Sequence, residues 1–374
     1  MNRPYHSTTP LIPGSLHSLA HERDNCGMGA IAQIHGKRSH EVLDYALTSV
    51  CNMTHRGAVD ADMKTGDGSG ILSQIPHPIF RRVVKELGGS IGSDDELAVG
   101  VFFLPDSDAG ACQQIKELAV STVKARGIGI IGWREVPVDP DALGKLARRT
   151  QPVIEQLLMK RPDGWDGDHF ERQLFLCRRR IEIETTGIPD FYRPSFSSRL
   201  ISYKGLAMPA ALRAFYKDLQ DSDFETAIAL YHQRFSTNTF PAWPLGQPFR
   251  MMCHNGEINT VEGNRNWLAS REDYFESEIW GEDIELLRNL VRSNTRCACW
   301  RRPPSPTMRR FPRTSGASIS SSVRSRSRGT ARRDWSIPMA SSSAPRSTAT
   351  ACVRPATSSP RMACSTSARR PARW

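Results

Sequence analysis

The chain has 374 residues and a formal net charge of +11, and 39% of its residues are hydrophobic. This length suits one large domain or two of ordinary size, and no apolar run of about 18 residues is present to span a membrane. The amino-terminal segment has no continuous apolar core, which excludes a secretory signal, and none of the nine cysteines lies in a C-x-x-C pair typical of zinc sites. An odd number of cysteines without a signal peptide leads us to expect a cytoplasmic protein.

Helical and extended patterns begin near residue 39. Apolar residues recur at helical spacing in "SHEVLDYALTSVC", with Ser39 at the N-cap. The segments "IFRRVVKEL" and "AGACQQIKELAVSTVKARG" end at glycines, as helices commonly do, whereas "GILSQIP", "ELAVGVFFLP" and "GIIGWREVPV" are short apolar runs typical of strands. We predict helices over 39–51, 79–87 and 109–127 and strands over 70–76, 96–105 and 129–138.

The next part of the chain continues the mixture. The long segment "DALGKLARRTQPVIEQLLMKR" is predicted as a helix broken near Pro152. The segments "RLISYKGLA", "TAIALYHQRFS" and "FRMMCH" alternate or run apolar and read as strands, and "NTVEGNRNWLASRE" begins a charged helix. The predicted elements are helices over 141–161 and 259–272 and strands over 199–207, 226–236 and 249–254. The pattern predicts helices together with substantial antiparallel sheet.

The composition changes at about residue 296. From there to the end the chain has 17 arginines, one aspartate, and no lysine, glutamate or leucine. This tail therefore carries +16 and leaves residues 1–295 at −5. A segment without leucine cannot bury a core. It is either a disordered basic arm that binds nucleic acid, as "SVRSRSRGT" suggests, or an out-of-frame reading of a GC-rich gene. Arginine without any lysine favours the second interpretation, which sequencing across codons 290–300 would test.

A single thiol in "NCGMGAI" is the first candidate for chemistry. The glycines after Cys26 leave its thiol and backbone sterically open. Taken alone, the Cys26–Gly27 dipeptide more often indicates a buried structural cysteine at the start of a strand.

The stretch "THRGAVDADMKTGDGSGIL" combines two glycine-rich segments with three acids, Asp60, Asp62 and Asp67. The spacing of the acids lacks the closing glutamate of a calcium loop. The "TGDGSG" segment lacks the lysine and hydroxyl residue that end a phosphate loop. A tight turn before the strand "GILSQIP" is the simplest interpretation, although so many glycines suggest that the backbone approaches something closely.

Two further stretches carry polar residues at strand ends. In "YHQRFSTNTFPAW" an apolar strand runs into Arg234, followed by a polar loop that contains Thr237. A guanidinium fixed there could grip a carboxylate through two hydrogen bonds, or it could simply cap the sheet edge. In "FRMMCHNGEINT" the Asn255–Gly256 pair could form a hairpin turn or an oxyanion hole.

Together these residues supply a thiol nucleophile, a carboxylate-binding arginine and an oxyanion hole, a set suited to acyl transfer from an amino-acid amide. No histidine is an obvious base for the thiol. The nearby candidates are His55, His232 and His254.

Three blocks together resemble a known family: "CGMGAIAQIHGKRSHEVLDYAL", "HRGAVDADMKTGDGSGI" and "HQRFSTNTFPAWPLGQPFRMMCHNGEINTVEGNRNW". They are similar to the N-terminal domain of the large subunit of bacterial glutamate synthase, which is a class II glutamine amidotransferase. The resemblance covers about residues 20–295, and the third block is highly specific. It implies an α+β fold of four αββα layers, that of the N-terminal-nucleophile hydrolases, incomplete at its C-terminal end. It also implies a role in glutamate biosynthesis.

The resemblance further implies that a leader, residues 1–25, is removed so that Cys26 becomes the first residue. Its α-amino group would then act as the base, with a pKa of about 7.7–8.0 that lies near the operating pH. Cys26 would attack L-glutamine, Arg234 would bind the glutamine carboxylate, and Asn255 with Gly256 would form the oxyanion hole.

The resemblance also implies further substrate contacts and the other parts of the intact enzyme. Arg56, Thr237 and the "TGDGSG" segment would lie around the substrate. In the intact enzyme, ammonia would pass to 2-oxoglutarate, with electrons delivered through FMN and an iron–sulfur cluster in downstream domains and through an NADPH-oxidising small subunit. For this chain itself we expect no bound cofactor, no metal ion and no association with a membrane.

The sequence departs from the family pattern after "SNT", at residue 295. The family continues with an aspartate that binds the substrate α-amino group, whereas here Cys297 stands in its place beside Arg296. Losing such a charged partner costs about 2–5 kcal/mol, and the arginine would repel the ammonium. We therefore expect little or no glutaminase activity and a weakly stable fold.

Two alternatives remain at this point. Another N-terminal-nucleophile amide hydrolase, such as a penicillin or bile-salt acylase, is disfavoured because Arg234 and the "HNGEIN" block suit an amino-acid substrate. A nucleic-acid-binding protein driven by the tail is disfavoured because residues 1–295 are net acidic; salt-dependent RNA binding that vanishes on deleting 296–374 would support it.

Overall fold

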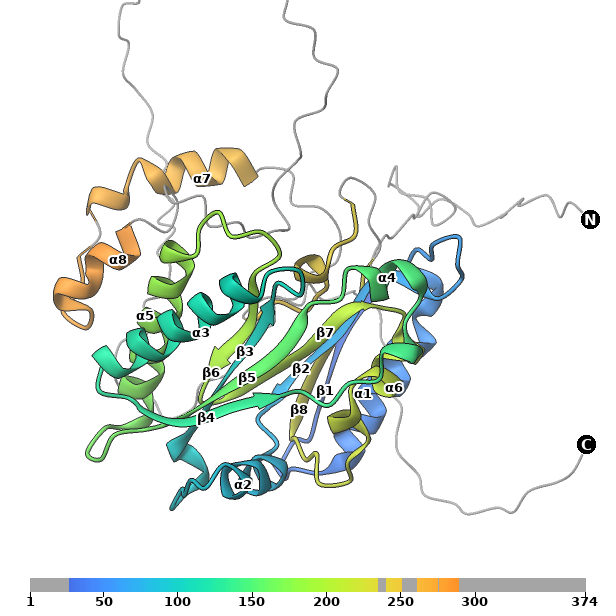
Figure 1. Ribbon diagram of the computed structural model, residues 1–374, viewed down its shortest axis with the longest axis horizontal. Helices are drawn as coiled ribbons and strands as arrows, with labels where there is room; N and C mark the ends of the chain where they lie inside the picture. The colour runs from blue at the N-terminus through green and yellow to red at the C-terminus, as the bar shows by residue number, and fades with distance from the viewer. Residues whose placement is uncertain (1–26, 235–239, 251–260, 275, 289–374) are drawn as a thin grey trace, which may run out of the picture. The chain divides into compact units, whose positions relative to one another are not determined.

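Two four-stranded antiparallel sheets, with helices on their outer faces, form the core of the structure (Figure 1). The computed structural model describes residues 27–234, 240–250, 261–274 and 276–288. All of them lie in the first of two compact units, which spans residues 1–306. The expected α+β class is confirmed.

The first sheet has the strand order β1-β8-β2-β7. Its strands are β1 (Gly27–Ala32), β2 (Thr65–Gln74), β7 (Leu200–Ala207) and β8 (Ile228–Gln233). The second sheet has the order β4-β5-β3-β6. Its strands are β3 (Leu97–Leu104), β4 (Gly129–Glu135), β5 (Val153–Lys160) and β6 (Tyr192–Ser197). All the ladders are antiparallel.

The helices cover the two sheets from opposite sides. The α-helices are α1 (His40–Asn52), α2 (His77–Glu86), α3 (Ala109–Ala125), α4 (Lys145–Arg149), α5 (Gly167–Glu184), α6 (Pro209–Phe215), α7 (Val261–Ala269) and α8 (Ile284–Arg288). Helix α1 packs on β1 and β8, while α3 and α5 pack together over the second sheet. Both long outer helices have aspartate N-caps: Asp108 accepts from the N–H of Ala111 at 2.9 Å and Asp166 from that of His169 at 2.6 Å.

Short 3₁₀ segments join several of these elements. They are η2 (Thr54–Arg56), η3 (Asp94–Glu96), η4 (Pro140–Ala142), η5 (Lys217–Gln220), η6 (Trp243–Leu245), η7 (Glu272–Tyr274) and η8 (Gly281–Asp283). No helix in the described residues is long and apolar enough to cross a membrane.

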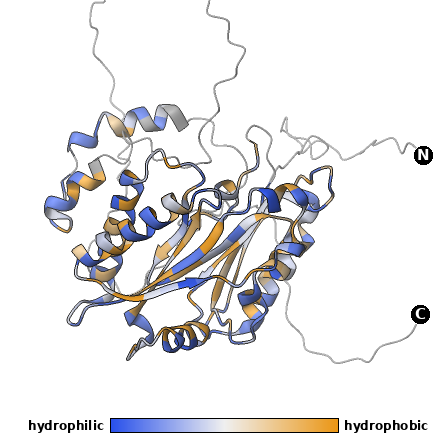
Figure 2. Ribbon diagram, viewed as in Figure 1, coloured by the Kyte–Doolittle hydropathy of each residue, from blue (hydrophilic) through white to orange (hydrophobic). Residues whose placement is uncertain are grey.

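Strand β3 is buried on both faces, between the two sheets on one side and under helices α3 and α5 on the other. Val99, Val101 and Phe103 point into the core between the sheets, whereas Ala98 and Phe102 pack under α3 and α5. A strand buried on both faces reads as an unbroken apolar run rather than an alternating one. Figure 2 shows the same arrangement, with hydrophobic strands inside and hydrophilic residues concentrated on the outer helices.

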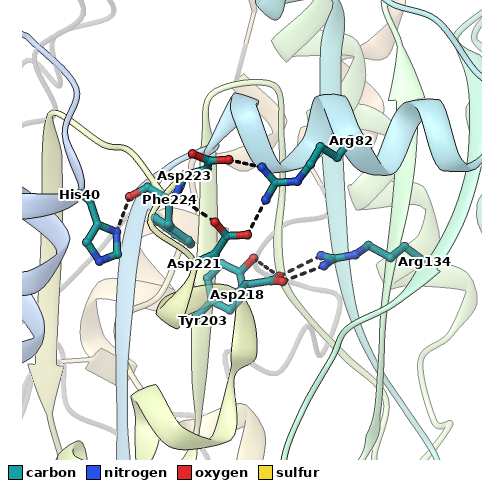
Figure 3. Close-up of polar contacts among 8 residues, drawn as sticks. All are labelled: His40, Arg82, Arg134, Tyr203, Asp218, Asp221, Asp223 and Phe224. Carbon is teal, nitrogen blue, oxygen red and sulfur yellow. Dashed lines mark hydrogen bonds and ion pairs between the residues drawn. The ribbon is translucent and has the colours of Figure 1, made fainter.

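A buried polar network ties the two sheets together. Arg134 of β4 donates two hydrogen bonds to the carboxylate of Asp218, at 2.7 and 2.8 Å, and the Tyr203 hydroxyl of β7 donates to the same carboxylate at 2.7 Å. Figure 3 shows this group beside two further ion pairs, which Arg82 forms with Asp221 and Asp223. Burial, together with the charge of Asp218, raises the pKa of Tyr203 well above its usual value.

Most predicted elements are confirmed, with shifts of a few residues at their ends. The helices predicted over 39–51, 79–87 and 109–127 are present, as are the strands over 96–105, 129–138 and 199–207. The strand over 226–236 is observed as β8. The helix over 259–272 is observed as the shorter α7. The strand over 249–254 falls mostly outside the described residues.

Two predictions were wrong. The helix over 141–161 is in fact η4, the short α4 and then strand β5, because "VIEQLLMK" pairs on both sides, with β3 and with β4. The expected turn at "TGDGSG" is instead the first half of β2, where the register shifts between Thr65 and Ser69. Helix α5 and strand β6 were not predicted.

Candidate active site

Strand β1 begins and strand β8 ends at the same end of the first sheet's strands. Gly27 is paired with Gln233, and Gln233 is also paired with Ser69 of β2. Arg234, the next residue after β8, is buried, with 7% of its surface exposed. Cys26 lies outside the described residues but is joined by one peptide bond to Gly27. This end of the sheet therefore brings Arg234 close to the neighbour of the candidate nucleophile.

The backbone of β2 fixes Arg234. The Arg234 N–H donates to the carbonyl of Gly68 at 2.9 Å, and its Nη1 donates to the carbonyl of Asp67 at 3.2 Å. Gly68 has a φ of +123°, and a Cβ there would lie 3.0 Å from the Cα of Gly246. A side chain at this position would be strained by both the dihedral and the contact. The glycine in "TGDGSG" thus serves the bulge that presents two carbonyls to Arg234.

Arg56 approaches the same end from η2. A Cβ built on Gly27 would lie 3.0 Å from the Sδ of Met53 and 3.3 Å from the Cβ of Arg56. A Cβ on Gly57 would lie 1.7 Å from the Nε2 of Gln233. The two glycines therefore allow η2 to pack directly against β1 and β8. Three segments that are far apart in sequence meet here.

The acids of the "DADMKTGD" stretch do not converge on a common point. Asp62 closes its own loop, because its carboxylate accepts from the N–H groups of Lys64 and Thr65 at 2.9 and 2.6 Å and from the Thr65 hydroxyl at 2.6 Å. These hydrogen bonds lower the pKa of Asp62. Among the described residues, no group of three or more His, Cys, Asp or Glu side chains is placed to hold a metal ion.

Sequence reasoning missed Lys204, which holds the segment that follows Arg234. Its side chain is fully buried, and Nζ donates to the carbonyls of Pro244 and Gly246 at 3.1 and 2.7 Å. The ammonium also lies 4.7 Å from the ring centre of Phe249. A lysine inside the predicted strand "RLISYKGLA" was the available signal, since a charge in a buried strand needs partners.

The remaining candidates are placed as follows. Thr237, Asn255, Gly256 and His254 lie outside the described residues. His55 is exposed in η2, whereas His232 is fully buried in β8, opposite Met28 and Gly70.

Three other cysteines provide a reference for reactivity. Burial raises the pKa of the Cys51, Cys112 and Cys177 thiols, that of Cys177 to about 12. A raised pKa reduces the thiolate fraction, so these thiols are poor nucleophiles.

Comparison with known proteins agrees with this geometry. Residues 26–297 match the family described as glutamine amidotransferases class-II. The chain is 44% identical over 272 residues to the glutamate synthase [NADPH] large chain of Azospirillum brasilense, covering 72% of this chain and 18% of that protein. It is 40% identical over 274 residues to ferredoxin-dependent glutamate synthase 2 of Synechocystis, covering 73% and 17%. It is 38% identical over 276 residues to the glutamate synthase [NADPH] large chain of Bacillus subtilis, covering 73% and 18%. The match thus spans less than a fifth of the length of these relatives.

Proposed function

Because the chain belongs to the class II glutamine amidotransferase family, we propose that residues 26–295 are the glutaminase domain of a glutamate synthase large chain. The reaction is hydrolysis of L-glutamine to glutamate and ammonia. The helix, sheet, sheet, helix layering supports the αββα fold of N-terminal-nucleophile hydrolases.

Cys26 is the proposed nucleophile. The family match begins at this residue, and Gly27, its neighbour, begins β1. Removal of residues 1–25 would expose an α-amino group with a pKa of about 7.7–8.0, which can take the thiol proton at neutral pH. The same group would return the proton to the leaving ammonia. Water would then hydrolyse the γ-glutamyl thioester.

Arg234 is the proposed anchor for the substrate α-carboxylate. Its position is set by the Gly68 and Asp67 carbonyls, which fix the base of the side chain and the guanidinium together. Guanidinium groups bind carboxylates through paired, charge-assisted hydrogen bonds. This fixed arginine beside the start of β1 is the structural observation that carries the proposal.

The other proposed contacts rest on the family resemblance. Asn255 and Gly256 would donate to the oxyanion, each contributing about 3 kcal/mol to the transition state. Arg56 and Thr237 would lie along the substrate. Arg56 is supported by its packing against Gly27.

The wider context is also proposed from the relatives. In an intact large chain the ammonia would be used with 2-oxoglutarate, FMN and an iron–sulfur cluster would be held by segments beyond this domain, and a small subunit would oxidise NADPH. For the chain as written, Cys297 in place of the amine-binding aspartate predicts weak or absent turnover.

Maturation and labelling together test this function despite weak turnover. Intact-mass measurement and N-terminal sequencing of the purified chain should show a start at Cys26. A chloroketone analogue of L-glutamine should then alkylate Cys26, and excess L-glutamine should slow that alkylation. A chain that retains residues 1–25, or labelling of Cys26 that glutamine does not slow, would contradict the proposal.

A further inference from the structure

A buried group of arginines lies away from the proposed glutamine site. Arg178 and Arg179 come from α5, Arg193 from β6, and Arg250 follows η6. Arg178, Arg179 and Arg193 contact the carboxylate of Glu182, and Arg250 acts on it through its charge; we call these four residues the arginine cluster. None of the four takes part in the proposed glutaminase reaction.

The contacts show how closely the charges are packed. Arg178 forms an ion pair with Glu182, Arg193 Nη2 lies 3.0 Å from the same carboxylate, and Arg179 Nη1 lies 3.4 Å from it. The guanidinium groups of Arg178 and Arg250 lie over the ring of Phe175, at 4.9 and 5.9 Å from its centre.

The cluster has more positive than negative charge. Glu171, which also acts on Arg250, already accepts from the Ser197 hydroxyl at 2.6 Å and from Ser198 at 2.7 and 2.8 Å. Among the described residues, the buried Nε atoms of Arg178 and Arg193 have no hydrogen-bond partner. Buried cations without counter-charges and buried donors without acceptors are both costly.

The pKa shifts of Arg178 and Glu182 agree with a surplus of positive charge in the cluster. Burial lowers the pKa of Arg178 to about 9; the charge of Glu182 opposes this shift, and repulsion from Arg250, Arg193 and Arg179 adds to it. Burial opposes ionisation of Glu182, yet Arg193, Arg178 and Arg250 lower its pKa to about 2. One carboxylate is thus saturated by several guanidinium groups.

We propose that the arginine cluster binds a small oxyanion with two or more negative charges, of the phosphate or sulfate type. Guanidinium forks match the oxygen geometry of such ions, and several forks can share one ion. Arg178 and Arg193 keep 9% and 8% of their side chains exposed and Glu182 keeps 13%, so solvent reaches the cluster.

An acidic side chain of the chain itself could take the place of such an ion. Five acidic side chains are not described by the structure: Glu22, Asp24, Glu257, Glu262 and Asp334. Glu257 is the nearest in sequence to Arg250 and is therefore the alternative counter-charge to test.

Equilibrium dialysis of the full chain with radiolabelled inorganic phosphate tests the proposal. We expect one saturable site that sulfate competes for and that chloride at equal ionic strength does not. Arg193→Gln should weaken binding about tenfold or more, because it removes a charge-assisted contact. The matched control is Arg180→Gln, because Arg180 is the exposed neighbour of Arg179 on α5 and forms an ion pair with Glu184; this variant should leave binding unchanged.

Further variants keep the test decisive. Circular dichroism checks folding, and if Arg193→Gln does not fold, Arg193→Lys keeps the charge, loses the fork and should still bind more weakly. Competition by chloride equal to that by sulfate would overturn the proposal. So would unchanged binding in the Arg193 variants, or a site that appears only in Glu257→Gln. Binding is measured without glutamine, so its failure is distinct from failure of the proposed function.

Discussion

The Nη1 atom of Arg234 donates to the backbone carbonyl of Asp67 at 3.2 Å, although the two residues are 167 positions apart in the chain. The same β2 segment accepts from the Arg234 N–H through Gly68. A bulged, glycine-rich strand therefore positions the one described side chain that is proposed to bind the substrate carboxylate. Changes in β2 should act on the site through Arg234.

Gly68→Ala should destabilise the fold and displace Arg234. The φ of +123° is unfavourable for alanine, and its Cβ would meet Gly246 and the carbonyl of Gly205. We expect a loss of roughly 1–3 kcal/mol in the free energy of unfolding, measured by urea titration. Gly88→Ala is the matched control, because Gly88 has a φ of +73° but nothing within 4 Å, and it should cost about 1 kcal/mol. Equal losses in the two variants would show that the close approach at Gly68 has no energetic role.

Asp218→Asn should be among the most destabilising single changes in the core. The variant leaves the partly buried Arg134 without its charged partner and weakens the acceptor for the buried Tyr203 (Figure 3). Breaking a buried pair in this way costs about 3–5 kcal/mol. Asp141→Asn breaks the exposed pair with Arg148 and should change the urea midpoint very little. A small effect of Asp218→Asn would mean that the network does not join the sheets energetically.

Stability should fall as the pH is lowered from 6.5 towards 4. Burial lowers the pKa of the His77 imidazole from 6.5 to about 4, with Arg38 and Arg81 also lowering it against the opposing charge of Asp94. Between these values the unfolded chain binds more protons than the folded chain, so stability present above pH 6.5 is lost on acidification. The loss from this group reaches roughly 3 kcal/mol at most. Urea titrations across this range should show a shallower pH dependence in His77→Gln, and the wild-type dependence in His35→Gln, which changes an exposed histidine.

Cys297→Asp should raise glutaminase activity. The resemblance to the family implies an aspartate for the substrate ammonium where this chain has Cys297. Restoring the charge should regain part of the roughly 2–5 kcal/mol attributed to such a contact, mainly as a lower KM. Ammonia release measured against glutamine concentration would show this, with Cys299→Asp as a control two residues away. An equal effect of both aspartates would contradict a specific role for position 297.

The local patterns predicted much of the fold because they matched the environments the elements occupy. Helix α1 buries Val42, Leu43, Ala46, Leu47 and Val50, the face expected from their spacing. Strand β5 was missed because the run "VIEQLLMK" fits either period, and only its pairing with β3 and β4 decides between them. That pairing is a long-range property that no local pattern carries.

The candidate site divides in the same way. Arg234 could be identified because it directly follows an apolar strand, and its burial fits a fixed role. The lysine inside the predicted strand signalled that Lys204 needs partners, but nothing local identifies those partners as the carbonyls of Pro244 and Gly246. Likewise, nothing local shows that Arg193 of β6 would form an ion pair with Glu182 of α5. Both depend on segments brought together only by the tertiary fold.

Alkylation of the mature chain by the chloroketone analogue of glutamine, followed by peptide mass mapping, tests the central claim most directly. Cys26 should be labelled first, with Cys51, Cys112 and Cys177 much slower because burial raises their pKa. Excess L-glutamine should protect Cys26, and Arg234→Lys should reduce that protection because lysine cannot form the paired contact. Labelling of Cys26 no faster than of Cys112, or protection unaffected by Arg234→Lys, would contradict a glutamine site built from Cys26 and Arg234.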